Sequence, residues 1–386
     1  MSNIFSSLDR LKDSTLNFAN VKSGEASLFV DGVHYVDFIS IGVSKSLNEL
    51  VHSFTFSLVD KWRASGEEWP IKIGSTVKIT FGVKTILSGY IDAIDSSFSN
   101  SGRNFSVSGR SKTCDLVDCS YVLQNQIKFT SFKQLAEKIC EQFDIDVVFN
   151  ALPFDEPFDF VLEQGETCFE ALTRYAAPRG YFMQTGPNGE LIIFNRDLFS
   201  KLERSTTDLI QGKNVIDLSG SFNYSSRFSE YTIKSQSTTK KNVTTAIANA
   251  TVGTSKDEAI KRFRPKMIIS DNVLLPISAL IQAQWESDTR ARQSMDVDLK
   301  VVDWKKADGE IWDIGELVAV SCPAIGINRD MLINSITYGK SNGGGTTCSI
   351  MVVPEGSFRN EPTKKDDAPA GWEEQVNSIT LGGMLA

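Results

Sequence analysis

A β-rich stretch of the chain occurs twice, and this internal repeat constrains the fold more than any other feature. The first copy covers residues 54–110, and the second runs from Met295 to about residue 354. In each copy two Trp residues bracket a loop, and an Ile-Gly-x-x-Val motif and a Leu-x-x-x-Ile strand follow. Two β-meanders can resemble each other by chance, but Trp is rare and four of the six Trp lie in register. We therefore expect two related β-domains, anchored by Trp62, Trp69, Gly74, Trp304, Trp312 and Gly315.

Short segments of alternating apolar and polar residues fill the first copy and the chain before it. Strands are expected at residues 39–46, 53–59, 77–81 and 86–94, and an Asp-Gly pair at residues 31–32 predicts a hairpin. Short strands joined by Gly- or Asn-containing turns are typical of an antiparallel barrel or sandwich. The repeated Gly residues suit turns or bulges. The Trp pairs suit core or loop anchors and not a ligand site.

Between the two copies the pattern changes to helices with short strands. Ser131 and Gln134 form a capping box before a segment with apolar residues at helical spacing. Thr167 and Glu170 form a second capping box, and a third helix is expected to begin at Pro276. These patterns predict a small α+β domain after the first copy.

The fold class predicted from these patterns is mainly β with α+β insertions, in which two antiparallel β-barrel domains flank a small α+β domain. The second barrel is expected to be discontinuous, because residues 295–354 alone hold too few strands to close. Residues 235–257 are rich in Ser, Thr, Asn and Ala and are expected to form a mobile insertion. The predicted parts are an arm at 1–24, a first barrel at 25–113, an α+β domain at 114–214, a second barrel at 215–236 plus 295–356, an insertion at 237–294 with a mobile loop and a helix, and a tail at 357–386.

The charge and hydropathy of the chain exclude several classes of protein. The net charge is −8 and the isoelectric point is about 5.1, which argues against a surface that grips nucleic acid. This charge is compatible with a surface that lets DNA pass. No apolar run is long enough to span a bilayer, and the first residues lack the pattern of a signal peptide. We expect a protein that is not inserted in a membrane and not exported by a standard route.

The residues that usually carry catalysis or bind metals are sparse. The six Cys residues show no metal-binding spacing and are expected to be buried free thiols, and only His34 and His52 are present. Asp92 and Asp95 could supply the carboxylate pair of a glycosidase, although turn residues on an acidic surface are the simpler interpretation. We predict no catalytic, cofactor-binding or metal-binding residues.

Two further patterns have simpler explanations than a functional motif. Residues 339–343 match Gly-x-Ser-x-Gly, but they lie between two expected strands and not between a strand and a helix, so a hairpin turn is predicted. A basic run at residues 261–266 could touch phosphate or a partner, or be a solvated patch.

Several segments resemble the baseplate hub protein of Mu-like contractile-tailed phages. They include WPIKIGSTVKIT, LSGYIDAIDSSF, FSVSGRSKTCDLVDCS, QAQWESDTRARQS and DGEIWDIGELVAV. The resemblance covers residues 25–356, is most specific at Val107–Asp118, and is weak at 235–260. It implies a fold related to the T-even phage hub and to the N-terminal part of type VI secretion spike proteins, with two tube-like barrels in each subunit.

The resemblance also implies a structural function without catalytic residues. The expected assembly is a homotrimer, a pseudo-sixfold ring that joins the hexameric tail tube to the trimeric, membrane-piercing spike and encloses a channel for DNA. The expected partners are the spike, the tail tube and other baseplate proteins, with DNA only in transit. The expected location is the virion tail of a phage or prophage, after assembly in the host cytoplasm. No cofactor is expected.

Two other functions are considered beside the hub. One is a tail-associated cell-wall hydrolase that uses Asp92 and Asp95. The other is a spike-type protein fused to effector chemistry, which the short segment after residue 356 argues against. The tail is expected to order only on a neighbouring spike protein or subunit, through Thr380, Leu381, Met384 and Leu385.

Overall fold

The computed structural model divides the chain into two compact units. Unit 1 is drawn from residues 1–222 and 295–358, and unit 2 from residues 223–294 and 359–386. The residues that the structure describes are 26–35, 38–59, 71–99, 102–122, 126–150, 158–163, 165–176, 181–195, 204–235, 252–270, 276–341 and 345–355.

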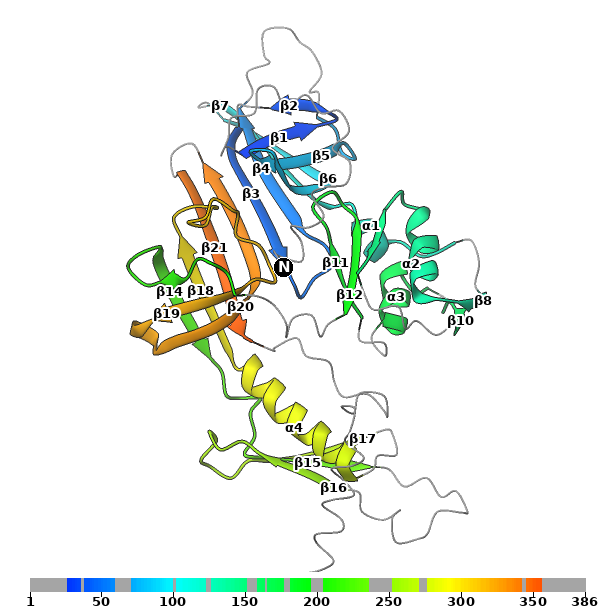
Figure 1. The fold of residues 1–386 in the computed structure, drawn as a ribbon. Coiled ribbons are helices and arrows are strands. Elements are labelled where there is room, and N and C mark those ends of the chain that lie inside the picture. The colour runs from blue at the N-terminus through cyan, green and yellow to red at the C-terminus, as the bar shows by residue number, and fades with distance from the viewer. Residues whose placement is uncertain are drawn as a thin grey trace, which may run out of the picture. The chain divides into compact units, whose positions relative to one another are not determined.

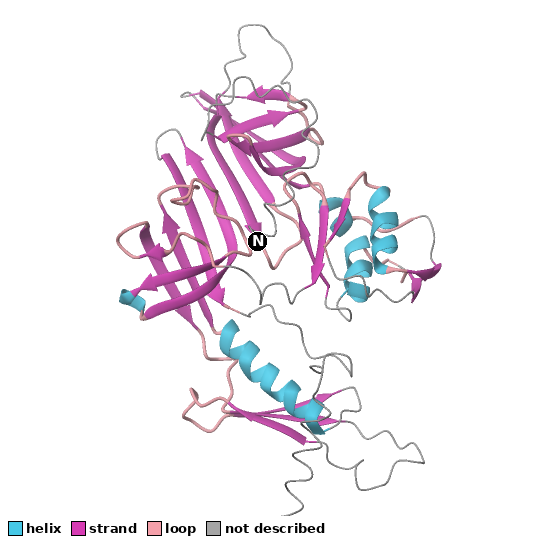
Figure 2. Cartoon of the chain, viewed as in Figure 1, coloured by secondary structure: helices cyan, strands magenta, loops and turns pink. Residues whose placement is uncertain are grey.

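Unit 1 is built around one thirteen-stranded sheet in which almost all neighbours are antiparallel (Figures 1 and 2). The first copy of the repeat and the chain before it supply β1 (Ala26–Val30), β2 (Val33–Tyr35), β3 (Phe38–Ser46), β4 (Ser53–Val59), β5 (Thr76–Phe81), β6 (Lys84–Ser99) and β7 (Gly102–Ser111). These strands lie in the order β3-β4-β7-β6-β5-β1-β2. The prediction of a mainly β fold with antiparallel sheets is confirmed.

The second copy, together with the strands that precede it, contributes the other end of the same sheet; from here on the first copy means residues 26–111 and the second copy means residues 209–222 plus 295–354. Its strands are β13 (Leu209–Ile210), β14 (Val215–Phe222), β18 (Met295–Val301), β19 (Leu317–Cys322), β20 (Ile327–Ser341) and β21 (Gly345–Pro354), with a 3-10 turn, η5, at Pro323–Ile325. They lie in the order β14-β18-β21-β20-β19-β13. Strand for strand, this order matches β3-β4-β7-β6-β5-β1.

One strand pair joins the two copies. β20 lies antiparallel to β3, so that the sheet continues from the second copy into the first (Figure 1). Among the described strands the pairing therefore follows an open path and closes neither copy on itself. A single hydrophobic core extends under both copies, from Leu28 and Phe54 at one end to Trp312 and Ile350 at the other.

The chain between the copies forms the small α+β part of unit 1. It contains α1 (Cys114–Asp118), α2 (Phe132–Glu141) and α3 (Cys168–Ala176), with β8 (Gln126–Thr130), β9 (Val147–Phe149), β10 (Phe158–Val161), β11 (Tyr181–Thr185) and β12 (Leu191–Asn195). Both predicted capping boxes are confirmed: Ser131 with Gln134 begins α2, and the backbone N–H groups and side chains of Thr167 and Glu170 bond reciprocally before α3. The apolar faces of α2 and α3 share a core with β11 and β12.

Unit 2 is a three-stranded sheet with one helix. Its elements are β15 (Glu230–Ser235), β16 (Val252–Lys256), β17 (Pro265–Ser270) and α4 (Pro276–Gln293), which begins at the predicted residue. The prediction of a mobile insertion is wrong for residues 252–256, because β16 pairs with β15. Gly253 allows this strand to lie directly against α4, since a Cβ there would lie 2.1 Å from the Ala279 carbonyl carbon.

The Gly-x-Ser-x-Gly match lies in a hairpin, as predicted. Ser341 at the end of β20 pairs with Gly345 at the start of β21. A nucleophile elbow joins a strand to a helix, so this segment is not one.

Candidate functional surface and the junction of the repeats

The pairing of β20 with β3 creates the junction between the two copies. Ser335–Ser341 lies opposite Ser40–Ser46 in a continuous antiparallel register. The hydroxyls of Ser44 and Thr337 are 3.0 Å apart across this pair. Main-chain pairing thus joins two segments that are far apart in the sequence into one continuous sheet.

Trp304 packs at this junction and contacts both copies. It is fully buried, and its Nε1 donates to the carbonyl oxygens of Gly339 at 3.0 Å and Thr347 at 2.9 Å. Its ring lies 4.9 Å from that of Phe81 in the first copy and 5.3 Å from that of Tyr338 in the second. The indole therefore fills the core where the copies meet and satisfies its one donor.

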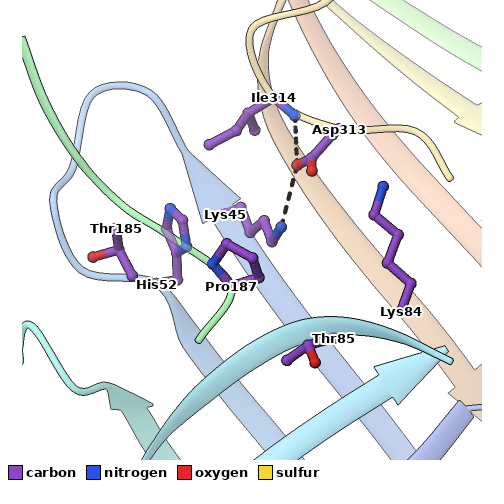
Figure 3. Close-up of a pocket in the computed structure, with 8 residues that line it drawn as sticks. All are labelled: Lys45, His52, Lys84, Thr85, Thr185, Pro187, Asp313 and Ile314. Carbon is purple, nitrogen blue, oxygen red and sulfur yellow. Dashed lines mark hydrogen bonds and ion pairs between the residues drawn. The ribbon is translucent and has the colours of Figure 1, made fainter. Parts of the chain in front are cut away.

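A buried ion pair crosses the same junction. Lys45 on β3 donates to the Asp313 carboxylate at 3.2 Å, and their side chains are 6% and 9% exposed (Figure 3). Burial alone raises the pKa of Asp313, but Lys45 and Lys84 outweigh it and the pKa lies below its ordinary value. The Asp313 carboxylate also accepts from the Ile314 backbone N–H at 2.9 Å. The buried carboxylate therefore accepts from both a cation and a backbone N–H group.

His52 lines a small cavity beside this pair, together with Lys45, Asp313, Thr185 and others (Figure 3). Burial, and then the positive charge of Lys45, lower its pKa to about 3. Its Nε2 lies 3.2 Å from the amide nitrogen of Gln184. A neutral, 3%-exposed imidazole with this partner is a packing residue and not an accessible base.

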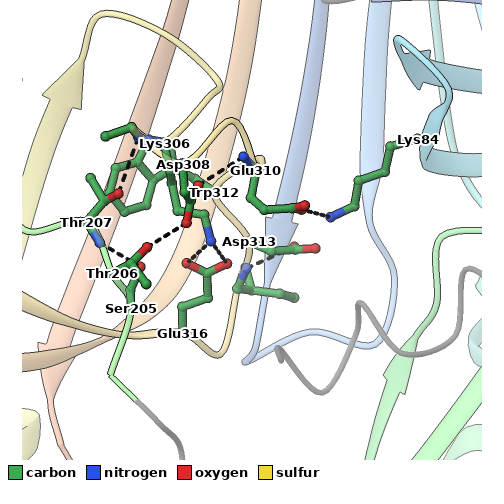
Figure 4. Close-up of polar contacts among 12 residues, drawn as sticks. Lys84, Ser205, Thr206, Thr207, Lys306, Asp308, Glu310, Trp312, Asp313 and Glu316 are labelled. Atoms are coloured by element: carbon green, nitrogen blue, oxygen red, sulfur yellow. Dashed lines mark hydrogen bonds and ion pairs between the residues drawn. The ribbon is translucent and has the colours of Figure 1, made fainter. Parts of the chain in front are cut away.

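The loop between the two Trp residues of the second copy is held by polar contacts (Figure 4). Lys306 donates to both oxygens of the Glu316 carboxylate at 3.1 and 3.2 Å, and burial nevertheless raises the pKa of Glu316 to about 7. Thr206 donates to Asp308 at 2.6 Å, while Lys84 reaches Glu310 at 3.8 Å. The loop is therefore tied to neighbouring segments of unit 1.

The predicted anchors of the repeat can be placed where the structure describes them. Gly74 and Gly315 have positive φ, at 85° and 76°, and their N–H groups donate to Ile91 and Ile333 at 2.8 and 2.9 Å. Trp312 is buried, and its carbonyl accepts from the Tyr338 hydroxyl. Trp62, Trp69 and the tail residues Thr380, Leu381, Met384 and Leu385 lie outside the described residues.

One face of the long sheet carries mainly small polar residues. Side chains on alternate positions point to the same face, and the positions opposite the core hold Ser, Thr and Gly with a few carboxylates and basic residues. They include Ser40, Gly42, Ser44, Thr55, Ser57, Asp95, Ser97, Ser106, Ser108, Ser219, Ser221, Asp298, Lys300, Thr337, Gly339, Thr347 and Ser349. We call this the serine-rich face. Among the positions named, Lys300 is the one cation.

Sequence reasoning missed both the serine-rich face and the Lys45–Asp313 pair. The serines occupy alternate positions in the predicted strands. Their location on one face of the sheet could therefore have been predicted from the sequence. Nothing in the sequence signals that Lys45 and Asp313 meet, because they lie in different copies.

Asp92 and Asp95, the two carboxylates considered for a hydrolase, have different surroundings. Asp92 accepts from Arg110 at 2.7 Å, and the same guanidinium binds Asp118 at 2.7 Å. Asp95 lies on the exposed edge of β6. Within the described residues, no group of three or more His, Cys, Asp or Glu could hold a metal ion. No described helix is both long and apolar enough to cross a membrane.

Three family models match successive parts of the chain. Residues 25–111 match the N-terminal part of the Mu phage baseplate assembly protein GpP-like family. Residues 113–195 match the second domain of the baseplate hub protein gp44-like family, and residues 276–361 match the fourth domain of the Mu phage baseplate assembly protein GpP.

Whole-chain relatives agree with these matches. The baseplate hub protein gp44 of Escherichia phage Mu is 25% identical over 352 residues, which cover 87% of this chain and 89% of that protein. The 43 kDa tail protein of prophage MuSo2 from Shewanella oneidensis is 30% identical, with a TM-score of 0.74 over 87% of this chain and all of the other. The type VI secretion component c3393 of E. coli, at 13% identity, shares the fold with a TM-score of 0.54 over 87% of this chain and 79% of that one.

Removing one member of the buried ion pair is expected to destabilise the fold strongly. Lys45→Met leaves Asp313 buried without its partner, and we expect a loss of about 3–5 kcal/mol in the free energy of unfolding, measured with urea. The double variant Lys45→Met/Asp313→Leu should recover most of it, because no charge is left buried. Arg204→Ala is the control: it breaks an exposed pair with Asp208 and should cost less than about 1 kcal/mol. Wild-type stability in Lys45→Met would contradict this account.

The buried His52 predicts a specific dependence of stability on pH. Its folded pKa of about 3 lies below the ordinary 6.5, so the unfolded chain binds the extra proton between these values. Stability from this group is complete above pH 6.5 and is lost as the pH falls towards 3, by up to about 1.4 kcal/mol per pH unit. The difference in unfolding free energy between wild type and His52→Gln should shrink over this range. A difference that is constant with pH would show that His52 does not titrate in this way.

Proposed function

Because this chain belongs to the family of Mu-like phage tail and baseplate hub proteins, we propose that it is the structural hub of a contractile-tail baseplate. In this proposal three subunits form a pseudo-sixfold ring. The ring joins the hexameric tail tube to the trimeric spike and encloses a channel through which DNA passes. The hub is located in the virion tail and is assembled in the host cytoplasm.

The observation that carries this proposal is the matching strand order of the two joined copies. Six strands of each copy lie in the same order in one sheet, although β13 is parallel to β19 whereas β1 is antiparallel to β5. A chain with two equivalent wall segments can present two similar edges to its neighbours, and three such chains present six. A closed ring of three then meets both threefold and sixfold partners. This arrangement favours two tube-like barrel domains derived by internal duplication.

The serine-rich face supports a channel function. Hydroxyl groups keep a surface hydrated, while Lys and Arg side chains would hold phosphates by displacing their counterions. The described face has few cations, and the chain carries a net charge of −8, which a trimer would multiply by three. Such a wall repels DNA weakly and lets it move. We assign this face to the channel wall.

The alternative of a cell-wall hydrolase has little support. Asp92 is engaged by Arg110, which also holds Asp118, so this carboxylate stabilises the fold between β6, β7 and α1. The family members found are named as tail and baseplate proteins. We therefore propose no catalytic residues and no cofactor for this chain. Its proposed partners are the spike, the tail tube and other baseplate proteins.

The proposed ring can be tested on the purified chain. Mass photometry should give a species of three times the 42.7 kDa monomer, and negative-stain images should show a three-lobed ring with a central hole. A monomer at all concentrations, with no ring in the images, would contradict the proposal.

The C-terminal tail provides a second test. We propose that residues 380–385 contact a neighbouring spike protein. A chain truncated after Glu355, the last described residue, should fold with unchanged thermal stability, because it keeps the described core residues, which run from Ala26 to Val353. Its association with a co-expressed spike protein should weaken in a pull-down assay. A truncated chain that fails to fold would show that the tail belongs to the core.

A further inference from the structure

Among the described strand edges of unit 1 that lack a partner, two belong to strands of the repeat that have a paired counterpart in the other copy. The second half of β6 pairs with β7 on one side, and no strand is recorded on the other. Residues 217–222 of β14 pair with β18 and with no other described strand. Exposed strand edges carry unpaired N–H and C=O groups and readily add another strand. Both edges are therefore candidates for an interface.

The strand orders identify these edges as counterparts of the two strands that meet inside the chain. β6 takes the place of β20, and β14 takes the place of β3. The β-bulges agree with this correspondence, because β6 and β20 shift register after Ile91 and Ile333 respectively. β3 and β14 shift after Phe38 and Val215. The edges thus correspond residue by residue as well as strand by strand.

The register of β20 with β3 then predicts a register for pairing between their counterparts, β6 and β14. Ser96 corresponds to Tyr338, because both lie three residues beyond the bulge in strands that pair with β7 and β21. Gly220 corresponds to Val43 through their equivalent partners on β18 and β4. Since Tyr338 lies opposite Val43, Ser96 belongs opposite Gly220 of another subunit.

We propose that the free edge of β6 in one subunit pairs antiparallel with β14 of the next, with Ile94–Ser99 opposite Asp217–Phe222 of the neighbouring subunit. This inference rests on the proposed trimeric hub and supplies its interface. The contact is heterologous, since each subunit uses a different edge on each side, and heterologous contacts form a ring when the rotation between subunits closes. The register places Asp95 opposite Ser221 of the neighbouring subunit, in the position of the Thr337–Ser44 pair.

The exposed apolar side chains fit this partner. Phe222 is 46% exposed, whereas Lys45 at the corresponding position of β3 is only 7% exposed. Ile73 is 69% exposed, whereas Ile314, which likewise precedes the repeated Gly, is 1% exposed. Ile94 on β6 is half-buried and would face Phe222 of the neighbouring subunit directly. A second copy of the chain would cover these groups as the internal junction covers their counterparts.

Disulfide trapping tests the register. The Ser44 and Thr337 hydroxyls are 3.0 Å apart, so cysteines at the corresponding pair should lie within reach of a disulfide. The chain with Asp95→Cys and Ser221→Cys should convert, on mild oxidation, to covalent dimer and trimer in non-reducing gels. Both positions are exposed, so neither change should disturb folding.

Matched variants separate the possible outcomes. Ser44→Cys/Thr337→Cys should form the same bond within one chain and serves as the positive control. Asp95→Cys/Ser219→Cys lies on the same face but two residues out of register, and should remain largely monomeric in the gel, as should each single variant and the wild type with its native thiols. The register is overturned if mass photometry shows a trimer but the Asp95/Ser221 pair does not cross-link, or cross-links no better than the shifted pair. A chain that is monomeric throughout overturns both the hub and its interface.

Discussion

The pairing of β3 with β20 is the interaction on which the arrangement of unit 1 depends. It joins Ser44 to Thr337, which are 293 positions apart, so the chain must order a very large loop before this contact forms. Trp304 and the Lys45–Asp313 pair lie beneath the contact and are buried by it. Buried ion pairs add little net stability but strongly penalise a missing partner, so we infer that this pair contributes more to selecting the correct strand pairing than to the stability of the fold.

Local signals in the sequence predicted local structure well. The capping boxes at Ser131 and Thr167, the start of α4 and the hairpin after β20 were all accessible, because each depends on residues close together in the chain. β16 was missed because its composition resembles a loop, and only pairing with β15 and contact with α4 make it a strand. The junction was missed for the same reason, since its two strands belong to different copies.

The repeat was visible in the sequence, but its geometric consequence was not. Trp and Gly mark it because a buried indole and a positive-φ turn tolerate few substitutes. The serines carry no such constraint individually, and their meaning appears only when neighbouring strands place them on one face. A property that belongs to a surface cannot be read from any single strand. The proposed channel wall is a property of this kind.

The side chains at the internal β3–β20 junction differ from those at the proposed β6–β14 interface. This difference favours one order of strands in the proposed ring. Inside the chain, Lys45 on β3 faces Asp313, whereas the corresponding positions of the proposed interface hold Phe222 and Lys72. If β3 of one subunit occupied the edge meant for β14, it would bring Lys45 against Lys72, and close like charges oppose association. If β14 replaced β3, Asp313 would be buried without Lys45, the cation that donates a hydrogen bond to it. Both exchanges are disfavoured, so these side chains favour one order of strands around the proposed ring. Main-chain pairing would be nearly the same at the internal junction and at the proposed interface. It could not by itself determine which strand occupies which edge.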